Sequence, residues 1–194
     1  MIFHLSNKLT FYLIKTNCIT DEEFSLYAYS LFLLIANILC IIEIILFGLI
    51  FKCIIGSIVF YISFRAIRNF AGGYHADTET RCEILTTLSF LVTTYLISIS
   101  EKSIIQIIVV VGTFFSIIVI AVFAPLDTPA KPLDDDEKRK YRRISLIILS
   151  VIVSVILVSL LLKIQLLLVP CCLSLVLEAI LLTAGKIKGH LIAD

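Results

Sequence analysis

Long apolar runs constrain this chain more than any other feature of its sequence. A helix needs about 20 mostly apolar residues to cross the hydrocarbon core of a bilayer. Six runs approach or exceed this length, at 26–50, 54–70, 84–99, 104–123, 144–162 and 166–184. Only 16% of the residues are charged, against about 25% in soluble domains. We therefore predict an all-α, polytopic membrane protein with about six transmembrane helices, built as a single domain over residues 1–194.

The first 20 residues have a different pattern from the apolar runs. Lys8 and Lys15 lie on one side of a predicted helix, whereas apolar residues recur on another side at spacings of three and four, namely Ile2, Leu5, Leu9, Tyr12 and Leu13. This pattern is typical of an amphipathic helix that lies in the membrane interface. A signal peptide is the competing interpretation, but the stretch lacks an uninterrupted apolar core and a small-residue cleavage site. We therefore predict an interfacial helix within residues 1–20.

The distribution of Lys and Arg predicts the orientation, because cytoplasmic loops carry an excess of these residues. With the N-terminus in the cytoplasm and six spans, 13 of the 16 positive residues fall inside, and three fall outside, namely Lys52, Lys102 and Lys163. We therefore predict a multi-pass protein of the cell membrane with both termini in the cytoplasm. The polar segment 65–83 and the loop 125–143 then face the cytoplasm, where the basic end of the loop is expected to contact anionic lipid.

Segment 65–83, RAIRNFAGGYHADTETRCE, places reactive side chains between two apolar runs. A thiolate nucleophile needs a base to take its proton or a positive field to stabilise its charge. His75 can supply the base for Cys82. Thr80, followed three residues later by Glu83, forms a capping-box pattern. Cys82 is therefore predicted at the second position of a helix, where the helix dipole favours the thiolate.

The spacing of the His75–Cys82 pair requires a break in the chain. In a continuous helix, the seven residues would separate the two side chains by about 10 Å along the axis, which is too far for proton transfer. Gly72 and Gly73 permit unusual backbone angles just before the histidine. The sequence therefore predicts a helix, a Gly-Gly break, a turn and a new helix start, which together bring the imidazole near the thiol.

Arg65 and Arg68 lie about one turn apart and so share a helix face. Because arginines at membrane depth are usually functional, these two could hold a substrate carboxylate or stabilise an oxyanion. The competing interpretation is that they anchor the topology. Likewise, His75 could be an ordinary loop histidine and Cys82 a buried thiol. Packing roles are expected for the other five cysteines, Cys18, Cys40, Cys53, Cys171 and Cys172.

The residues alone leave other classes of function open. His75, Asp77 and Cys82 could be zinc ligands, but the chain has no CxxC or HExxH pattern and a structural zinc site needs four ligands. We therefore expect no metal and no cofactor. A transporter or channel could use the two arginines together with Glu43, although Glu43 and Glu178 could instead pair with groups on other helices. A purely structural membrane protein would leave the Gly-Gly-His-Cys grouping unexplained.

The string R-x-x-x-GG-x-H-A, with a cysteine seven residues after the histidine, resembles the accessory gene regulator B family. The downstream APLDTPAKPL is similar to the Pro-containing cytoplasmic loop of that family. The resemblance implies an integral-membrane cysteine endopeptidase of Gram-positive peptide quorum sensing, which cleaves the C-terminal tail from a short amphipathic precursor peptide. It also implies a homodimer, and no nucleic-acid partner is expected.

Carried over to this chain, the resemblance implies that His75 is the general base and Cys82 the nucleophile. A side chain of the precursor would then attack acylated Cys82, which gives a cyclic thiolactone or lactone. A third catalytic residue is not assigned, although Asp77 and Glu83 are nearest in sequence. The residues expected to bind substrate, orient the catalytic pair or stabilise an oxyanion are Arg65, Arg68, Asn69, Gly72, Gly73 and Asp77.

Overall fold

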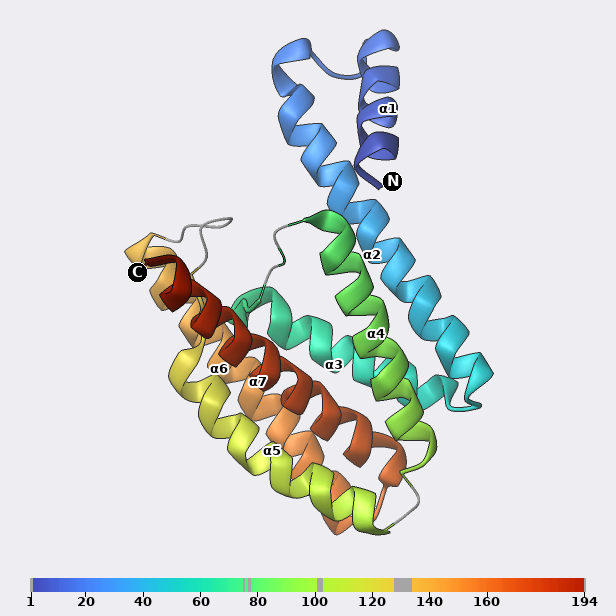
Figure 1. The fold of residues 1–194 in the computed structure, drawn as a ribbon, viewed down its shortest axis with the longest axis vertical. Coiled ribbons are helices and arrows are strands. Elements are labelled where there is room, and N and C mark those ends of the chain that lie inside the picture. Colours follow the sequence, from blue (N-terminus) through green and yellow to red (C-terminus); the bar gives the residue numbers. More distant parts are fainter. Residues whose placement is uncertain (1, 75, 77, 101–102, 128–133, 194) are drawn as a thin grey trace. The chain divides into compact units, whose positions relative to one another are not determined.

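The computed structural model describes residues 2–74, 76, 78–100, 103–127 and 134–193. Throughout these ranges the regular structure is helical, which confirms the predicted all-α class. The elements shown in Figure 1 are α1 (Ile2–Lys15), a 3-10 turn (Asp21–Glu23), α2 (Phe24–Ile50), α3 (Ile54–Ala71), α4 (Glu79–Ser98), α5 (Ser103–Phe123), α6 (Asp135–Leu161) and α7 (Gln165–Ala193).

Contacts within the chain divide it into two compact units, Met1–Glu43 and Ile44–Asp194. The division falls inside α2, so no linker separates the units in sequence. Segment 65–83 belongs wholly to the second unit. The described part of the candidate site can therefore be built from the second unit alone.

The first unit contains α1 and the beginning of α2. The aromatic rings of Phe11 and Phe24 lie 4.8 Å apart and join these two helices. Along α1 the small side chains of Ser6 and Thr10 are buried, whereas large apolar side chains are exposed, namely Phe3, Leu5, Leu9, Phe11 and Tyr12. Such an exposed apolar face suits a helix that rests against lipid. The interfacial location of residues 1–20 stays a prediction.

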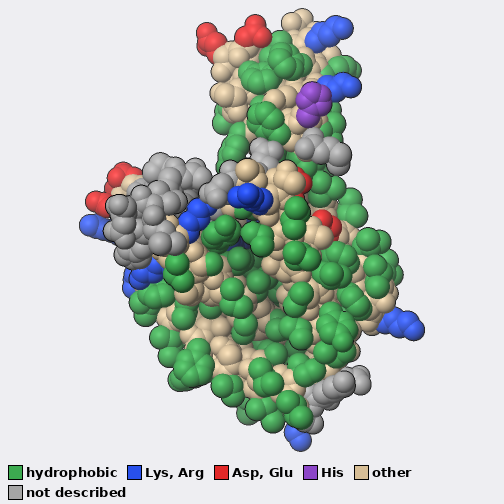
Figure 2. All heavy atoms as spheres, in the orientation of Figure 1, with side chains coloured by type: hydrophobic (Ala, Val, Ile, Leu, Met, Phe, Trp, Pro, Cys, Tyr) green, Lys and Arg blue, Asp and Glu red, His purple; other side chains and the backbone are tan. Residues whose placement is uncertain are grey.

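The second unit is arranged around α7. This helix packs most extensively on α5 and α3, then on α6, and Figure 1 shows α5, α6 and α7 side by side. Its buried positions include Val169, Cys171, Cys172, Leu175 and Leu182. The surrounding helices expose large apolar side chains, such as Ile107, Phe114, Val151 and Leu157, and hydrophobic side chains dominate the face seen in Figure 2. This distribution is expected of a helical bundle that is surrounded by lipid.

Five of the six predicted spans are confirmed by length and apolarity, and they correspond to α2, α3, α5, α6 and α7. The sixth, α4, falls short of these criteria because charged and hydroxyl side chains interrupt its apolar sequence. Helix α4 nevertheless packs antiparallel to α3, as its contacts with that helix show. The Cys53 thiol before α3 donates to the Thr94 carbonyl near the end of α4, while Phe60 and Phe64 further along α3 contact Phe90.

The end of α3 and the chain after α5 lie at one end of the second unit. The Leu126 N–H donates to the Ala71 carbonyl at 2.9 Å, so the two segments are adjacent. Helix α6 then begins at Asp135, capped by the side chain of Asp134. The basic run at the end of the predicted loop 125–143 is therefore helical, while residues 128–133 lie outside the described residues.

Candidate functional site

The predicted Gly-Gly break is present at the end of α3. The Gly72 N–H donates to the Arg68 carbonyl at 3.2 Å and ends the helix, with a φ of 75° at Gly72. Gly73 follows with a φ of 136°. L side chains rarely adopt either angle, so glycines are required where the chain leaves α3 and turns toward position 75.

Arg68 holds this turn from the inside. Its Nη1 donates to the Gly72 carbonyl at 2.6 Å and its Nη2 donates to the Tyr74 carbonyl at 2.7 Å. Only 13% of the Arg68 side chain is exposed. The guanidinium therefore contacts the backbone of its own chain, which favours a role in shaping the turn. The predicted contact of Arg68 with a substrate is not tested by this arrangement.

Helix α7 forms the other wall of the turn. The Tyr74 N–H donates to the Leu181 carbonyl at 2.8 Å. The backbone comes this close because Gly185 has no side chain; a Cβ there would lie 2.8 Å from the Tyr74 nitrogen and 2.9 Å from the Gly73 carbonyl carbon. One turn before Leu181, Glu178 is fully buried with its Oε2 3.8 Å from Arg68 Nη1. Of the two roles that the sequence left open for Glu178, the structure shows the pairing with a group on another helix.

Helix α4 begins two residues earlier than predicted. Thr78 is the N-cap residue, and its hydroxyl accepts from the Arg81 N–H at 3.4 Å. The predicted cap at Thr80 is therefore wrong, because the hydroxyl of Thr78 serves equally well and the intervening residues fit the first helical turn. Cys82 consequently occupies the fourth helical position, and its N–H donates to the Thr78 carbonyl at 3.1 Å. The helix dipole acts on Cys82 less strongly than at the second position.

Arg68 provides a second source of positive charge near Cys82. The half-buried Cys82 and Arg65 both lie close enough to Arg68 to interact with it electrostatically. A guanidinium beside a cysteine attracts the ionised sulfur. The end of α3 and the beginning of α4 therefore share an electropositive environment.

The predicted roles of His75, Asp77 and Asn69 are not tested by the described residues. His75 and Asp77 lie outside the described residues, so the predicted approach of the imidazole to the thiol stays a prediction. Asn69 is exposed at the end of α3, and its predicted role toward an oxyanion is likewise untested. Glu83 follows Cys82 in α4 and is not the capping partner of Thr80.

Sequence reasoning missed the contribution of α7 to this site. Nothing in the sequence singled out the Leu181 carbonyl, and Gly185 was not singled out although a glycine within a helix often has a packing reason. Glu178 was noticed as a carboxyl within an apolar run, but neither its role nor its partner could be chosen from the sequence. The partner is Arg68, which ties α7 to the turn at the end of α3.

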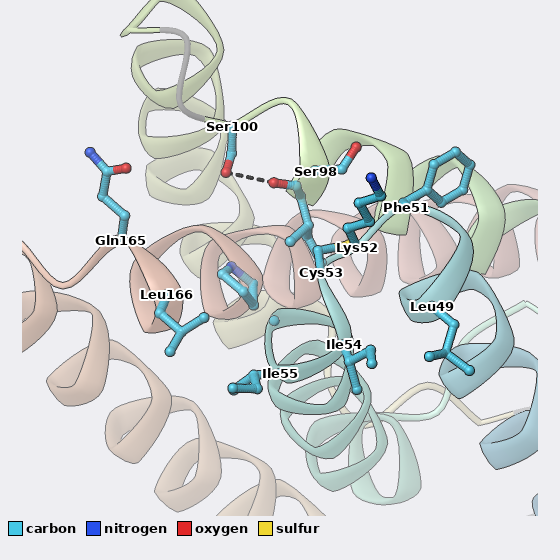
Figure 3. A pocket seen from close by; sticks show the side chains of 13 residues that line it. Leu49, Phe51, Lys52, Cys53, Ile54, Ile55, Ser98, Ser100, Gln165 and Leu166 are labelled. Atoms are coloured by element: carbon cyan, nitrogen blue, oxygen red, sulfur yellow. Dashed lines mark hydrogen bonds between the residues drawn. The ribbon is translucent and has the colours of Figure 1, made fainter.

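A pocket of about 670 Å³ lies at the opposite end of α3 (Figure 3). The α2–α3 turn, the end of α4 and the beginning of α7 form its walls. Its labelled lining residues include Lys52, Cys53, Ser98, Ser100 and Gln165. None of the predicted site residues lines this pocket. This pocket and the predicted site residues are therefore separated by the length of α3.

Fold and site together define a multi-pass helical membrane protein with a cysteine near a Gly-Gly turn. Hydrogen bonds with Arg68 and Leu181 hold this turn in place. The family model of accessory gene regulator B matches residues 6–182, and the chain belongs to this family. An AgrB-like protein 2 of Clostridium perfringens strain 13 is 26% identical over 125 residues, and so is an AgrB-like protein of strain SM101. Each alignment covers 62% of this chain and 58% of the relative. No solved structure matches the chain.

Proposed function

We propose that this chain is a membrane-embedded cysteine endopeptidase that matures a quorum-sensing peptide. It removes the C-terminal tail of a short amphipathic precursor and promotes cyclisation of the remainder. The observation that best supports the proposal is the turn after α3. Arg68 and Leu181 form hydrogen bonds with the backbone immediately before position 75, and Cys82 lies near Arg68. Membership in the accessory gene regulator B family supports the same assignment.

The proposed reaction begins with proton transfer from the Cys82 thiol to the imidazole of His75. The thiolate attacks the carbonyl carbon of the scissile peptide bond, and the resulting imidazolium protonates the leaving amine. The tail departs, and the rest of the precursor remains bound to Cys82 as a thioester. A thiol or hydroxyl of the same precursor then attacks this thioester, which forms the ring and returns the free Cys82 thiol.

The membrane location favours ring closure over hydrolysis. A thioester retains the activation of the acyl group, so ring closure needs no ATP. Cys82 lies in the first turns of α4 and is only half exposed, and restricted water at such a site slows the competing hydrolysis. An amphipathic precursor that lies in the interface would approach at this depth. The family-based expectation of a homodimer remains part of the proposal.

The transport hypothesis is weakened by the partners of Arg68. A transport pathway needs charged groups that face the permeating solute. Instead, Arg68 pairs with the buried carboxylate of Glu178 and donates to two backbone carbonyls. We therefore place peptide processing ahead of transport.

Co-expression with a short amphipathic precursor peptide tests this function, with the products weighed by mass spectrometry. Cys82→Ala and His75→Ala should abolish release of the tail while the protein still inserts, and Cys82→Ser should retain a trace because a hydroxyl is the poorer nucleophile. Cys53→Ala is the matched control, since Cys53 is also half-buried but lies at the opposite end of α3. Full processing by Cys82→Ala would refute the proposal.

A further inference from the structure

We propose that Glu178 is a positioning residue that acts through Arg68 on the segment entering position 75. This inference rests on the proposed function, because it assigns the pair to the placement of the general base. The carboxylate and the guanidinium form one unit that joins α7 to the turn after α3. In this proposal neither residue touches the reacting atoms.

The surroundings of Glu178 indicate a role that requires its charge. Its side chain is fully buried, and neither carboxylate oxygen has a hydrogen-bond partner among the described residues. Burial of a carboxylate without hydrogen bonds is costly, and its compensation here is the guanidinium of Arg68 at 3.8 Å. Removal of one partner of a buried pair is strongly destabilising, whereas apolar replacement of both is often neutral. Packing stability alone therefore does not account for the pair.

The geometry of Arg68 explains what the pair accomplishes. Its two terminal nitrogens donate to the carbonyls on either side of Gly73, at residues 72 and 74. A planar guanidinium presents these donors in a rigid fork, so it fixes the relative orientation of the two peptide groups. A Cβ at Gly73 would overlap the guanidinium, which shows how closely the fork fits the turn. Glu178 supplies the counter-charge that keeps this fork buried and directed at the turn.

A second contact holds the same turn without any side chain. The Tyr74 N–H donates to the Leu181 carbonyl on α7, so the turn stays attached to the bundle when the ion pair is removed. We therefore expect the pair to determine the orientation of the chain at position 75 more than the stability of the fold. Removing both charges should give an inserted protein whose base is misplaced.

The rate at which iodoacetamide alkylates Cys82 tests this inference without the natural substrate. The full chain would carry Cys82 as its remaining cysteine and would be reconstituted in lipid nanodiscs. Four proteins are compared: the parent, His75→Ala, the double variant Arg68→Met/Glu178→Met, and His75→Ala combined with Arg68→Lys. Methionine is chosen because it is unbranched and of similar length to both residues. Thr113→Val, which removes a buried hydroxyl contact to α7, is the matched control.

We expect the double variant to slow alkylation about as much as His75→Ala does, by about tenfold or more. Arg68→Lys combined with His75→Ala should be no slower than His75→Ala alone, because lysine keeps the positive charge near Cys82 and a positioning residue that acts through the base has no further effect once the base is absent. Thr113→Val should react at the parent rate. Arg68→Lys gives a second test, because lysine keeps a charge for Glu178 but lacks the fork, so it should also slow alkylation.

The outcomes separate this inference from the proposed function. Alkylation of the double variant or of Arg68→Lys at the parent rate would overturn the positioning role, and so would an additional slowing by Arg68→Lys in the His75→Ala background. A His75→Ala protein that reacts at the parent rate would instead refute the His–Cys pair itself. If the double variant fails to insert, Arg68→Lys decides the question, since its ion pair is retained.

Discussion

Replacing Gly185 with alanine would push a methyl group into the backbone of the turn before position 75. The new Cβ would lie 2.6 Å from the Leu126 Cδ2, 2.8 Å from the Tyr74 nitrogen and 2.9 Å from the Gly73 carbonyl carbon. The leucine side chain can rotate away, but the other two atoms belong to the backbone. A shift of about 0.6 Å is needed to bring the nitrogen to 3.4 Å, the short limit of ordinary van der Waals contact.

The size of this shift determines the expected effect. Misplacement of a catalytic group by about 1 Å can cost about 100-fold in rate, so we expect Gly185→Ala to slow precursor processing by roughly tenfold or more. The loss of stability should be small. Overpacking costs about 1–3 kcal/mol, while exchange of glycine for alanine within a helix recovers up to about 1 kcal/mol. Slow tail release from a protein that inserts and melts normally is therefore the predicted phenotype.

Gly189→Ala is the matched control on the same helix. A Cβ at Gly189 has nothing within 4 Å, so this substitution adds the same methyl group about one turn later without contacting the turn. We expect its tail release, followed by mass spectrometry under identical expression, to equal that of the parent chain. Equal rates for Gly185→Ala and the parent chain would refute the close packing of the turn on α7.

Three further substitutions examine the same end of the molecule. Gly73→Ala should abolish processing without preventing insertion, because its Cβ would overlap the Arg68 guanidinium; normal tail release would contradict the observed turn. Thr78→Ala removes a long N-cap hydrogen bond of 3.4 Å and should lower the free energy of unfolding by about 0.5 kcal/mol, the low end for such caps, as measured by circular dichroism in detergent. Asp127→Asn breaks an ion pair with Lys138 in which both side chains are 42% exposed; its melting temperature should stay unchanged, since exposed pairs contribute little.

Most of the helices could be predicted from the sequence because five of the six apolar runs are long and clearly bounded. The run 54–70 corresponds to α3 (Ile54–Ala71), and the run 104–123 corresponds to α5 (Ser103–Phe123). The beginning of α4 was misplaced because Thr78 and Thr80 are both capable N-caps, and sequence alone does not rank two such hydroxyls. Residues 79 and 80 were left out of the predicted helix for this reason.

The site could be predicted only where its residues are neighbours in the chain. The Gly-Gly break follows from the backbone freedom of glycine, so it was recognisable in the sequence. The partners of Arg68 were not, because they depend on where α7 lies. Glu178 and Leu181 reach the turn through the packing of α7 on α3, and a single sequence contains no signal for that pairing.

The most direct test of the proposed chemistry is the mass of the protein trapped during turnover. The chain would be denatured rapidly after mixing with its precursor in nanodiscs, digested, and weighed with and without hydroxylamine. Our account predicts that the peptide containing Cys82 gains the mass of the precursor without its tail, and that hydroxylamine removes this adduct. Release of the tail with no adduct, or with an adduct on a different cysteine, would contradict it.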